Sequence, residues 1–188
     1  MVASNPHEIA NVNSLPPSSV LTYASPGINT AHECSIIKDA QYKLSLAMKI
    51  LIREGSITKN FAALRPIISE CSKKYRDYLM FCFDNAHPNT LFNGYINLMV
   101  ARSIEHGHDL VDVLKIACIN SVIHYKIPVG WLKVGDPADF ISITKNIKTF
   151  KIDKTYINGK LIFSDDQSYI PLLNENPINN FNCRKSPL

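Results

Sequence analysis

Apolar residues recur along this chain with two different spacings, and the two spacings predict alternating strands and helices. Short apolar runs that end at turn or charged residues predict buried strands at residues 48–52 and 78–83, and a shorter strand at residues 20–24. Apolar positions three and four residues apart predict helices over residues 36–48, from Asn60 to residue 68, over residues 90–105 and over residues 109–122. Ser35, Asn60 and Asp109 are expected to cap three of these helices, and Gly107 is expected to end another.

This order of elements predicts an α/β fold with a parallel sheet, because parallel strands need a crossover connection that is usually helical. Strands that are apolar throughout also suit a sheet covered on both faces. The sequence pattern changes after Tyr125, where glycines and prolines separate short predicted strands. Asn158 and Gly159 stand between strand-forming residues and predict a hairpin with a type I′ turn. A small β unit is therefore expected to follow the α/β part.

Composition narrows the class of protein. The chain has 188 residues, of which 46% are hydrophobic and 19% charged, and these values favour a packed globule over disorder. The net charge of +4 comes from scattered lysines and arginines, which argues against nucleic-acid binding. Five cysteines without a CxxC pair argue against a disulfide framework and favour a reducing compartment. Neither a signal peptide nor a membrane span is expected, and a cytoplasmic location follows by default.

Asp84 is the strongest candidate for a catalytic or metal-binding residue, because it directly follows a predicted buried strand. A carboxylate there can bind a metal or accept a proton, although an aspartate that caps a turn is common after strands and stays an alternative. His32, in the run Ala31-His32-Glu33-Cys34, is a weak candidate by itself. His106 and His108 lie at a predicted helix end, where residues two apart do not face one another, so no metal site is expected there.

Several segments, taken in order, resemble the bacterial-type adenine deaminase family of the amidohydrolase superfamily. They are Ala31-His32-Glu33-Cys34, the REGS run at residues 53–56 with Lys59-Asn60, and FCFDNAHP at residues 81–88. Downstream, GWLKVGDPADFISI at residues 130–143 and YINGKLI at residues 156–162 are similar to the family's return into its small β domain. The resemblance covers roughly residues 28–163.

The resemblance implies a metal-dependent hydrolase with a TIM-type barrel, which converts adenine and water to hypoxanthine and ammonia. It implies that Asp84 is catalytic and also a metal ligand, and that His32 is a metal ligand. Glu54, Ser56 and His87 would line the purine pocket. The expected organisation is a loose arm over residues 1–19, a partial (β/α) barrel over 20–128, a small β unit over 129–163 and an irregular tail over 164–188.

The chain also departs from the family pattern. The family's His-x-His pair and its bridging acidic ligand would lie upstream of residue 1. Ala24 is expected to occupy the position of the fifth-strand histidine, within residues 23–27, and the crossover between the fifth and sixth strands is expected to be missing. Asn85 replaces the second aspartate of an Asp-Asp pair.

These departures predict an incomplete fragment that is inactive alone and holds a divalent metal (Mn, Fe or Zn) weakly. The expected partners are adenine or a related purine, and a complementary chain or a second copy, with no nucleic acid and no membrane. The alternative is a degenerate, non-catalytic remnant or interaction module. A different nucleobase or cyclic amide as the substrate also stays open.

Overall fold

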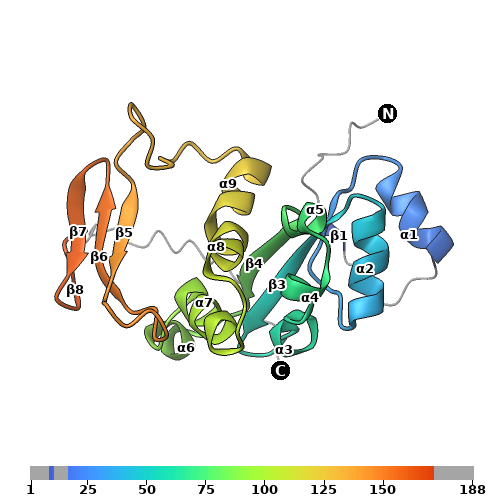
Figure 1. Cartoon of the computed structure of the whole chain (residues 1–188), viewed down its shortest axis with the longest axis horizontal. Coiled ribbons are helices and arrows are strands. Elements are labelled where there is room, and N and C mark those ends of the chain that lie inside the picture. The colour runs from blue at the N-terminus through green and yellow to red at the C-terminus, as the bar shows by residue number, and fades with distance from the viewer. Residues whose placement is uncertain (1–8, 11–16, 172–188) are drawn as a thin grey trace, which may run out of the picture.

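A parallel sheet and an antiparallel sheet form the framework of the protein (Figure 1). The computed structural model describes residues 9–10 and 17–171. The parallel sheet contains, in spatial order, β1 (Ile9–Ala10), β2 (Thr30–Ala31), β3 (Lys49–Gly55) and β4 (Leu79–Asp84). The antiparallel sheet contains, in spatial order, β5 (Phe140–Ile143), β6 (Ile152–Ile157), β7 (Lys160–Ser164) and β8 (Gln167–Ser168).

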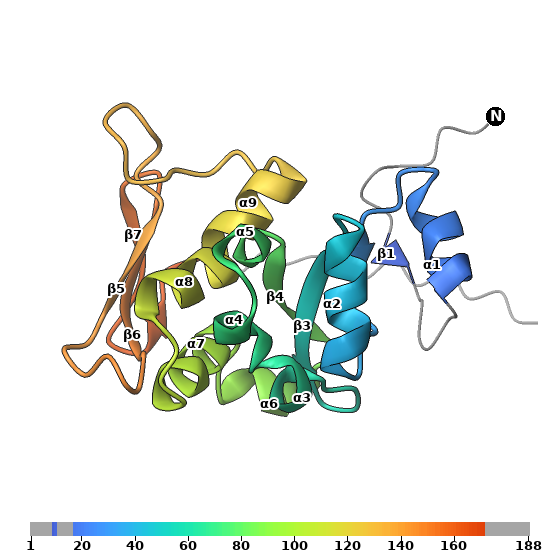
Figure 2. The same cartoon turned by 45° about the vertical axis from the view of Figure 1, so that its right-hand side comes forward.

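Helices connect the parallel strands and separate the two sheets. The connections between the parallel strands hold α1 (Pro17–Ala24), α2 (Ile37–Ser45), α3 (Phe61–Leu64), α4 (Ile67–Glu70) and α5 (Lys73–Arg76). After β4 come α6 (Pro88–Phe92), α7 (Ile96–Glu105), α8 (Leu110–Leu114), the π-helical turn η1 (Lys115–Ile119) and α9 (Asn120–Tyr125). Figures 1 and 2 both place α7 and α8 between the parallel sheet and the antiparallel sheet. No helix in the described part of the chain is long and apolar enough to cross a membrane.

The predicted α/β architecture with a parallel sheet is confirmed. The two buried strands of the prediction correspond to β3 and β4, which pair in parallel from Ile50–Leu79 to Gly55–Asp84. The predicted hairpin is also present, because Tyr156 and Ile157 of β6 pair with Leu161 and Lys160 of β7. Asn158 and Gly159 have φ values of 49° and 74°, the positive values that a type I′ turn needs.

The prediction for the N-terminal region was wrong. Residues 20–24 belong to helix α1 rather than to a strand, and part of the expected arm is ordered, since Ile9–Ala10 pairs in parallel with Thr30–Ala31. Helix α1 therefore lies in a crossover between β1 and β2, which was expected to be missing. Ala24 ends this helix, so it does not stand at a strand-end ligand position. Tertiary packing decided the conformation, because the side chain of Val20 is fully buried in the core.

Proline and glycine divide two of the predicted helices. Pro66 separates α3 from α4, because proline has no N–H to continue the helical ladder. Gly94, with a φ of 137°, separates α6 from α7. Gly107, with a φ of 84°, follows the end of α7 as predicted.

Only one of the three predicted helix caps is confirmed. The Asp109 carboxylate accepts hydrogen bonds from the N–H groups of Val111 and Asp112. Helix α2 begins one residue later than expected, after Ile36, and no side chain caps it. Asn60 does occupy the N-cap position of α3, but its side chain makes no capping bond there.

At its C-terminal end the described chain extends the antiparallel sheet into the segment expected to be irregular, because Gln167–Ser168 pairs with β7. Residues 172–188 of the expected tail lie outside the described residues. The division into arm, partial barrel, β unit and tail stays a proposal with these changes.

The core is mostly apolar, but several polar side chains are buried in it or beside it. Side chains of α2, β3, α3, α4, β4 and α7 pack into a single cluster that includes Leu44, Ile50, Ile52, Phe61 and Leu79. Lys43 is also fully buried, and its ammonium lies 2.9 Å from the Asp39 carboxylate and 3.5 Å from the Cys34 sulfur. Because an isolated charge in an apolar core is very costly, the Asp39 carboxylate beside the ammonium offsets part of the cost of burying it.

We expect Asp39→Asn to lower the free energy of unfolding by about 3 kcal/mol, because it removes the negative charge that faces the buried ammonium. Lys43→Met removes the charge and keeps most of the volume, so it should cost less than about 1 kcal/mol or even stabilise the fold. Urea unfolding of both variants measures the difference. A larger loss for Lys43→Met would contradict this account.

Asp139 joins the strands of the β unit to the segment that leads into it. One carboxylate oxygen accepts a hydrogen bond from the Asn158 N–H at 2.8 Å, and the other accepts one from the Gly130 N–H at 3.0 Å. These two backbone donors lower the pKa of Asp139 below its ordinary value of 3.8, because they favour the charged form.

A carboxyl group whose pKa is lower in the folded state than in the unfolded state stabilises the fold at pH values above its unfolded pKa. This contribution is lost as the pH falls through its folded pKa. Asp139→Asn should therefore lower the melting temperature at pH 7 and have less effect near pH 3. Thermal unfolding followed by circular dichroism at the two pH values checks this. An equal loss at both values would mean that the charge of Asp139 is not the cause.

Candidate functional site: a charged cluster at the strand ends

The C-terminal ends of three parallel strands bring charged side chains together. His32 and Glu33 follow β2 directly, Arg53 belongs to β3, and Asp84 is the last residue of β4. Parallel pairing places these ends at one edge of the sheet, where α/β barrel enzymes hold their catalytic groups. Gly55 makes the close approach possible, because a Cβ at this position would lie 1.9 Å from the backbone oxygen of Asp84.

His32, Glu33 and Asp84 form a cluster of potential metal ligands, with one ligand atom from each lying within 4.8 Å of the others. The His32 Nε2 atom is 3.1 Å from Glu33 Oε1. The His32 Nδ1 atom is buried and has no hydrogen-bond partner in the described part of the chain. The structure thus brings together both ligands expected from the sequence and adds Glu33. Its position directly after His32 was the only signal for it in the sequence.

Arg53 holds the two carboxylates of this cluster. Its Nη1 atom lies 2.9 Å from Glu33 Oε1 and 2.7 Å from Asp84 Oδ2, and only 6% of its side chain is exposed. One guanidinium against two carboxylates leaves the cluster with one excess negative charge, His32 aside. The sequence pattern indicated no role for Arg53, although this residue begins the REGS run.

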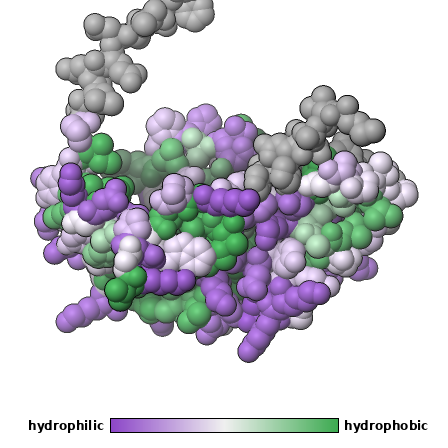
Figure 3. Space-filling model, turned by 90° about the horizontal axis from the view of Figure 1, so that it is seen from above, coloured by the Kyte–Doolittle hydropathy of each residue, from purple (hydrophilic) through white to green (hydrophobic). Residues whose placement is uncertain are grey.

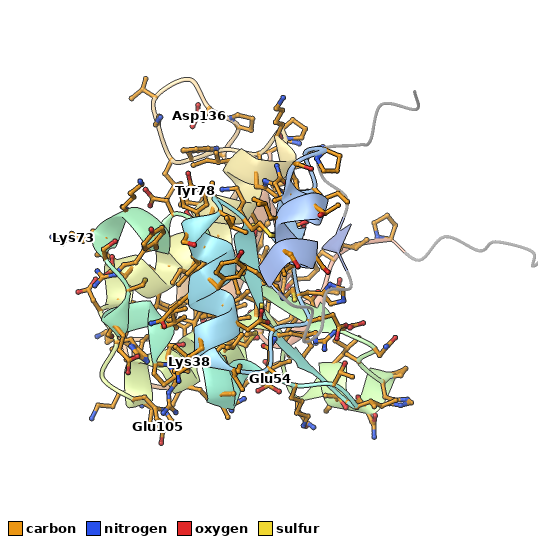
Figure 4. All side chains as sticks on the ribbon, turned by 90° about the vertical axis from the view of Figure 1, so that its right-hand side faces the viewer. Lys38, Glu54, Lys73, Tyr78, Glu105 and Asp136 are labelled. Atoms are coloured by element: carbon orange, nitrogen blue, oxygen red, sulfur yellow. The ribbon has the colours of Figure 1, made fainter. Side chains whose placement is uncertain are left out.

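Glu54 is not part of the cluster. Neighbouring residues of a strand point to opposite faces, and Glu54 faces α7, where its Oε1 lies 2.5 Å from Arg102 Nη1. The Arg102 guanidinium also lies over the Phe61 ring, 4.3 Å from its centroid. Figure 4 shows Glu54 low in the view and Tyr78, which precedes β4, high in it, at the opposite end of the sheet.

Ser56 and His87 join the loops that follow β3 and β4. Ser56 Oγ accepts a hydrogen bond from the His87 N–H at 2.9 Å and lies 3.0 Å from the Thr90 hydroxyl. The His87 side chain is exposed, and the residue acts here through its backbone at the start of α6. Neither side chain reaches the charged cluster in an interaction described by the structure.

The nearby cysteines and the second histidine pair take no part in the cluster. Burial raises the pKa of Cys34 and that of Cys82 to about 12, so both remain thiols at neutral pH. His106 Nδ1 lies 2.7 Å from the Arg102 backbone oxygen, and His108 Nδ1 lies 2.5 Å from the Ser69 hydroxyl. The two histidines thus have separate hydrogen-bond partners, and the expectation that they form no metal site stays a prediction.

The sequence profile of the amidohydrolase family matches residues 19–162. The chain belongs to the amidohydrolase family. It is 71% identical over 174 residues to an adenine deaminase of Borreliella burgdorferi and 43% identical over 166 residues to an adenine deaminase of Parabacteroides distasonis. These alignments cover 93% and 88% of this chain but only 32% and 30% of the two relatives, so the chain spans about a third of their length.

A solved structure supports the fold of this amidohydrolase chain. The β-aspartyl dipeptidase from Fervidobacterium islandicum AW-1 superposes with a TM-score of 0.65 at 16% identity, over 89% of this chain and 49% of that one. The parallel sheet and its helices are therefore part of a TIM-type barrel, as the resemblance implied, and sheet order leaves β4 at an edge of the described sheet.

The cluster fits the divalent metal that is typical of amidohydrolases. One imidazole and two carboxylates form a mixed nitrogen and oxygen ligand set that suits Mn, Fe or Zn, and His32 Nε2 lies beside the Glu33 carboxylate. The buried His32 Nδ1 has no hydrogen-bond partner in the described residues that would hold the ring in another orientation. The excess negative charge favours a cation. The Arg53 guanidinium already contacts an oxygen of each carboxylate, however, so a metal has to compete with it for these oxygens.

We expect Arg53→Gln to tighten Mn²⁺ binding on the order of tenfold, about 1.4 kcal/mol, because it removes the competing positive charge. The variant should also melt at a lower temperature without metal, and Mn²⁺ should restore more of its stability than in the wild type. Calorimetric titration and thermal unfolding measure the two effects. Arg76→Gln, which breaks the Arg76–Asp112 pair outside the cluster, is the control and should bind Mn²⁺ like the wild type.

Proposed function

We propose that this chain is the later part of an adenine deaminase, an enzyme that hydrolyses adenine to hypoxanthine and ammonia. The observation that carries the proposal is the His32–Glu33–Asp84 cluster at the strand ends of a chain 71% identical to an adenine deaminase. The chain spans about a third of such relatives, so the proposal includes further metal ligands and barrel strands from outside it. By itself the chain should bind metal weakly and be inactive.

Asp84 is proposed as the residue that moves the proton. Its Oδ2 atom is held by Arg53, and no hydrogen bond in the described structure engages its Oδ1. A bound divalent metal would activate water for attack on the ring carbon that bears the amino group. Asp84 Oδ1 would take one proton of that water and deliver it to the amino nitrogen, which leaves as ammonia when the C–N bond breaks. The second proton of the water would end on the neighbouring ring nitrogen of hypoxanthine. Arg53 would keep the carboxylate in place during both transfers.

Ser56 and His87 are proposed to shape the edge of the purine pocket, because their hydrogen bond joins the two loops that follow β3 and β4. Glu54 belongs to this proposal in a supporting role, through its ion pair with Arg102. Direct contact of these three residues with a purine stays a prediction.

The metal is proposed to be Mn, Fe or Zn, since a mixed nitrogen and oxygen ligand set suits all three. The free thiols of Cys34, Cys71, Cys82 and Cys118 suit a reducing compartment, so a cytoplasmic location remains part of the proposal.

The completing partner is proposed to be a complementary chain, with a second copy of this chain as the alternative. β4 has a neighbouring strand on one side only in the described sheet, so its other edge is available to a further strand. Exposed apolar side chains on and after α9 also need a covering surface, and the face seen from above carries apolar areas between polar ones (Figure 3). The exposed apolar side chains on and after α9 include Ile123, Ile127, Val129, Leu132 and Val134.

The test is ammonia release from adenine by metal-loaded protein, measured alone and after co-expression with the part of the Borreliella burgdorferi relative that this chain does not cover. We expect no turnover alone and measurable turnover from the combination. Asp84→Asn should lower that turnover at least about a hundredfold, because the variant lacks the carboxylate that carries the proton. Asp77→Asn, two residues before the start of β4, should leave it unchanged.

Two outcomes would change the proposal. If the combination folds and binds metal but releases no ammonia, the chain is better described as a non-catalytic remnant or interaction module. If it is inactive on adenine but hydrolyses another nucleobase or a cyclic amide, the reaction class stands and the substrate does not.

A further inference from the structure

The side chain of Asn60 makes hydrogen bonds to three backbone groups beside the charged cluster. Its Oδ1 atom accepts from the Arg53 N–H at 2.6 Å, and its Nδ2 atom donates to the backbone oxygens of His32 at 3.2 Å and Cys34 at 2.9 Å. The Asn60 N–H also donates to the Arg53 oxygen at 3.0 Å. The residue is only 6% exposed.

The topology of the sheet explains why this amide is needed. β2 pairs with β3 only at Thr30 and Ala31, opposite Lys49 and Ile50, whereas β3 continues to Gly55. Beyond Ala31 the chain that carries His32 and Glu33 no longer pairs with its neighbour as a strand. Asn60 bridges this gap, because its amide connects the backbone of the 32–34 segment to the backbone of Arg53. Buried backbone groups need such partners.

The contacts of Asn60 therefore serve the cluster rather than the helix that it begins. Its side chain makes no capping bond to α3. Instead, it connects the backbone of His32 and Cys34, on either side of Glu33, to the backbone of Arg53. The Arg53 guanidinium in turn holds Glu33 and Asp84.

We propose that Asn60 is a positioning residue that sets the place of His32 and Glu33 relative to Arg53 and Asp84. Its expected effect on metal binding rests on the proposed function, whereas its effect on the geometry of His32 does not. Groups that orient metal ligands without touching the metal typically change affinity 10- to 100-fold when they are removed.

Asn120 provides a matched control at the opposite end of the sheet. It is 3% exposed, and its Nδ2 atom donates to the backbone oxygens of Arg76 at 2.9 Å and Leu79 at 2.7 Å. It thus holds a loop at the start of β4 in the same way as Asn60 holds the loop after β2. Asn60→Ala and Asn120→Ala should each lower the free energy of unfolding, as loss of a buried amide does, and urea unfolding measures this cost.

The first measurement needs no metal. We expect the ring ¹H–¹³C NMR signals of His32 to shift in Asn60→Ala and in Asn60→Asp, and to stay at their wild-type positions in Asn120→Ala. Asn60→Asp retains the acceptor for the Arg53 N–H and removes the two amide donors, so it tests those donors directly. Unshifted His32 signals in both Asn60 variants, or equal shifts in Asn120→Ala, would overturn the proposal.

The second measurement is Mn²⁺ affinity by calorimetric titration. Binding should weaken 10- to 100-fold in Asn60→Ala and stay at the wild-type value in Asn120→Ala. If wild type and Asn60→Ala bind Mn²⁺ equally, the positioning role is wrong while the metal site stands. If the wild type binds no Mn²⁺ but His32 shifts as expected, the metal part of the proposed function fails and the positioning role stands.

Discussion

The pair of ion pairs that Arg53 Nη1 forms with Glu33 and Asp84 is the interaction on which the arrangement at the strand ends depends. It links the chain after β2 to the last residue of β4 through a side chain of β3, the strand between them. A nearly buried guanidinium is stable only when carboxylates compensate its charge, and two carboxylates this close need a cation between them. Each group therefore requires the others, and changing one alters the electrostatic environment of the whole edge.

The same cluster connects the fold to its proposed chemistry. A guanidinium and a divalent metal are alternative partners for the same carboxylate oxygens, so the affinity for metal depends on how far Arg53 has to give way. In a complete barrel, further ligands from other strands would favour metal binding over the ion pairs with Arg53. This is consistent with a family that typically depends on a divalent metal and with a chain that is expected to hold the metal weakly when isolated.

The architecture also explains why this chain, which spans about a third of the length of its relatives, can still form a packed core. Helices α2, α3, α4 and α7 cover one face of the strand pair β3–β4, which buries apolar side chains such as Ile50, Ile52 and Leu79. What is missing from this sheet is closure, because β4 has no second neighbour among the described strands. Barrels remove such edges by pairing the last strand with the first.

Much of this organisation is determined by the sequence alone. Apolar runs locate β3 and β4, Asn158 and Gly159 determine a hairpin because few other residues adopt positive φ, and Asp109 caps its helix through a local hydrogen bond. The position of Asp84 after a buried strand likewise indicates a strand-end carboxylate. These features depend on residues close together in the chain, whose preferences survive in any fold that buries the apolar runs.

Only the tertiary structure decided the rest, because it depends on contacts between distant segments. Residues 20–24 have strand-forming side chains but became helical, since Val20 could be buried in that conformation. Arg53 and Glu54 are adjacent in sequence, yet one joins the cluster and the other pairs with Arg102, because a strand alternates its faces. Asn60 reads as a helix cap, but its amide found backbone partners at His32 and Cys34, more than twenty residues away in the chain.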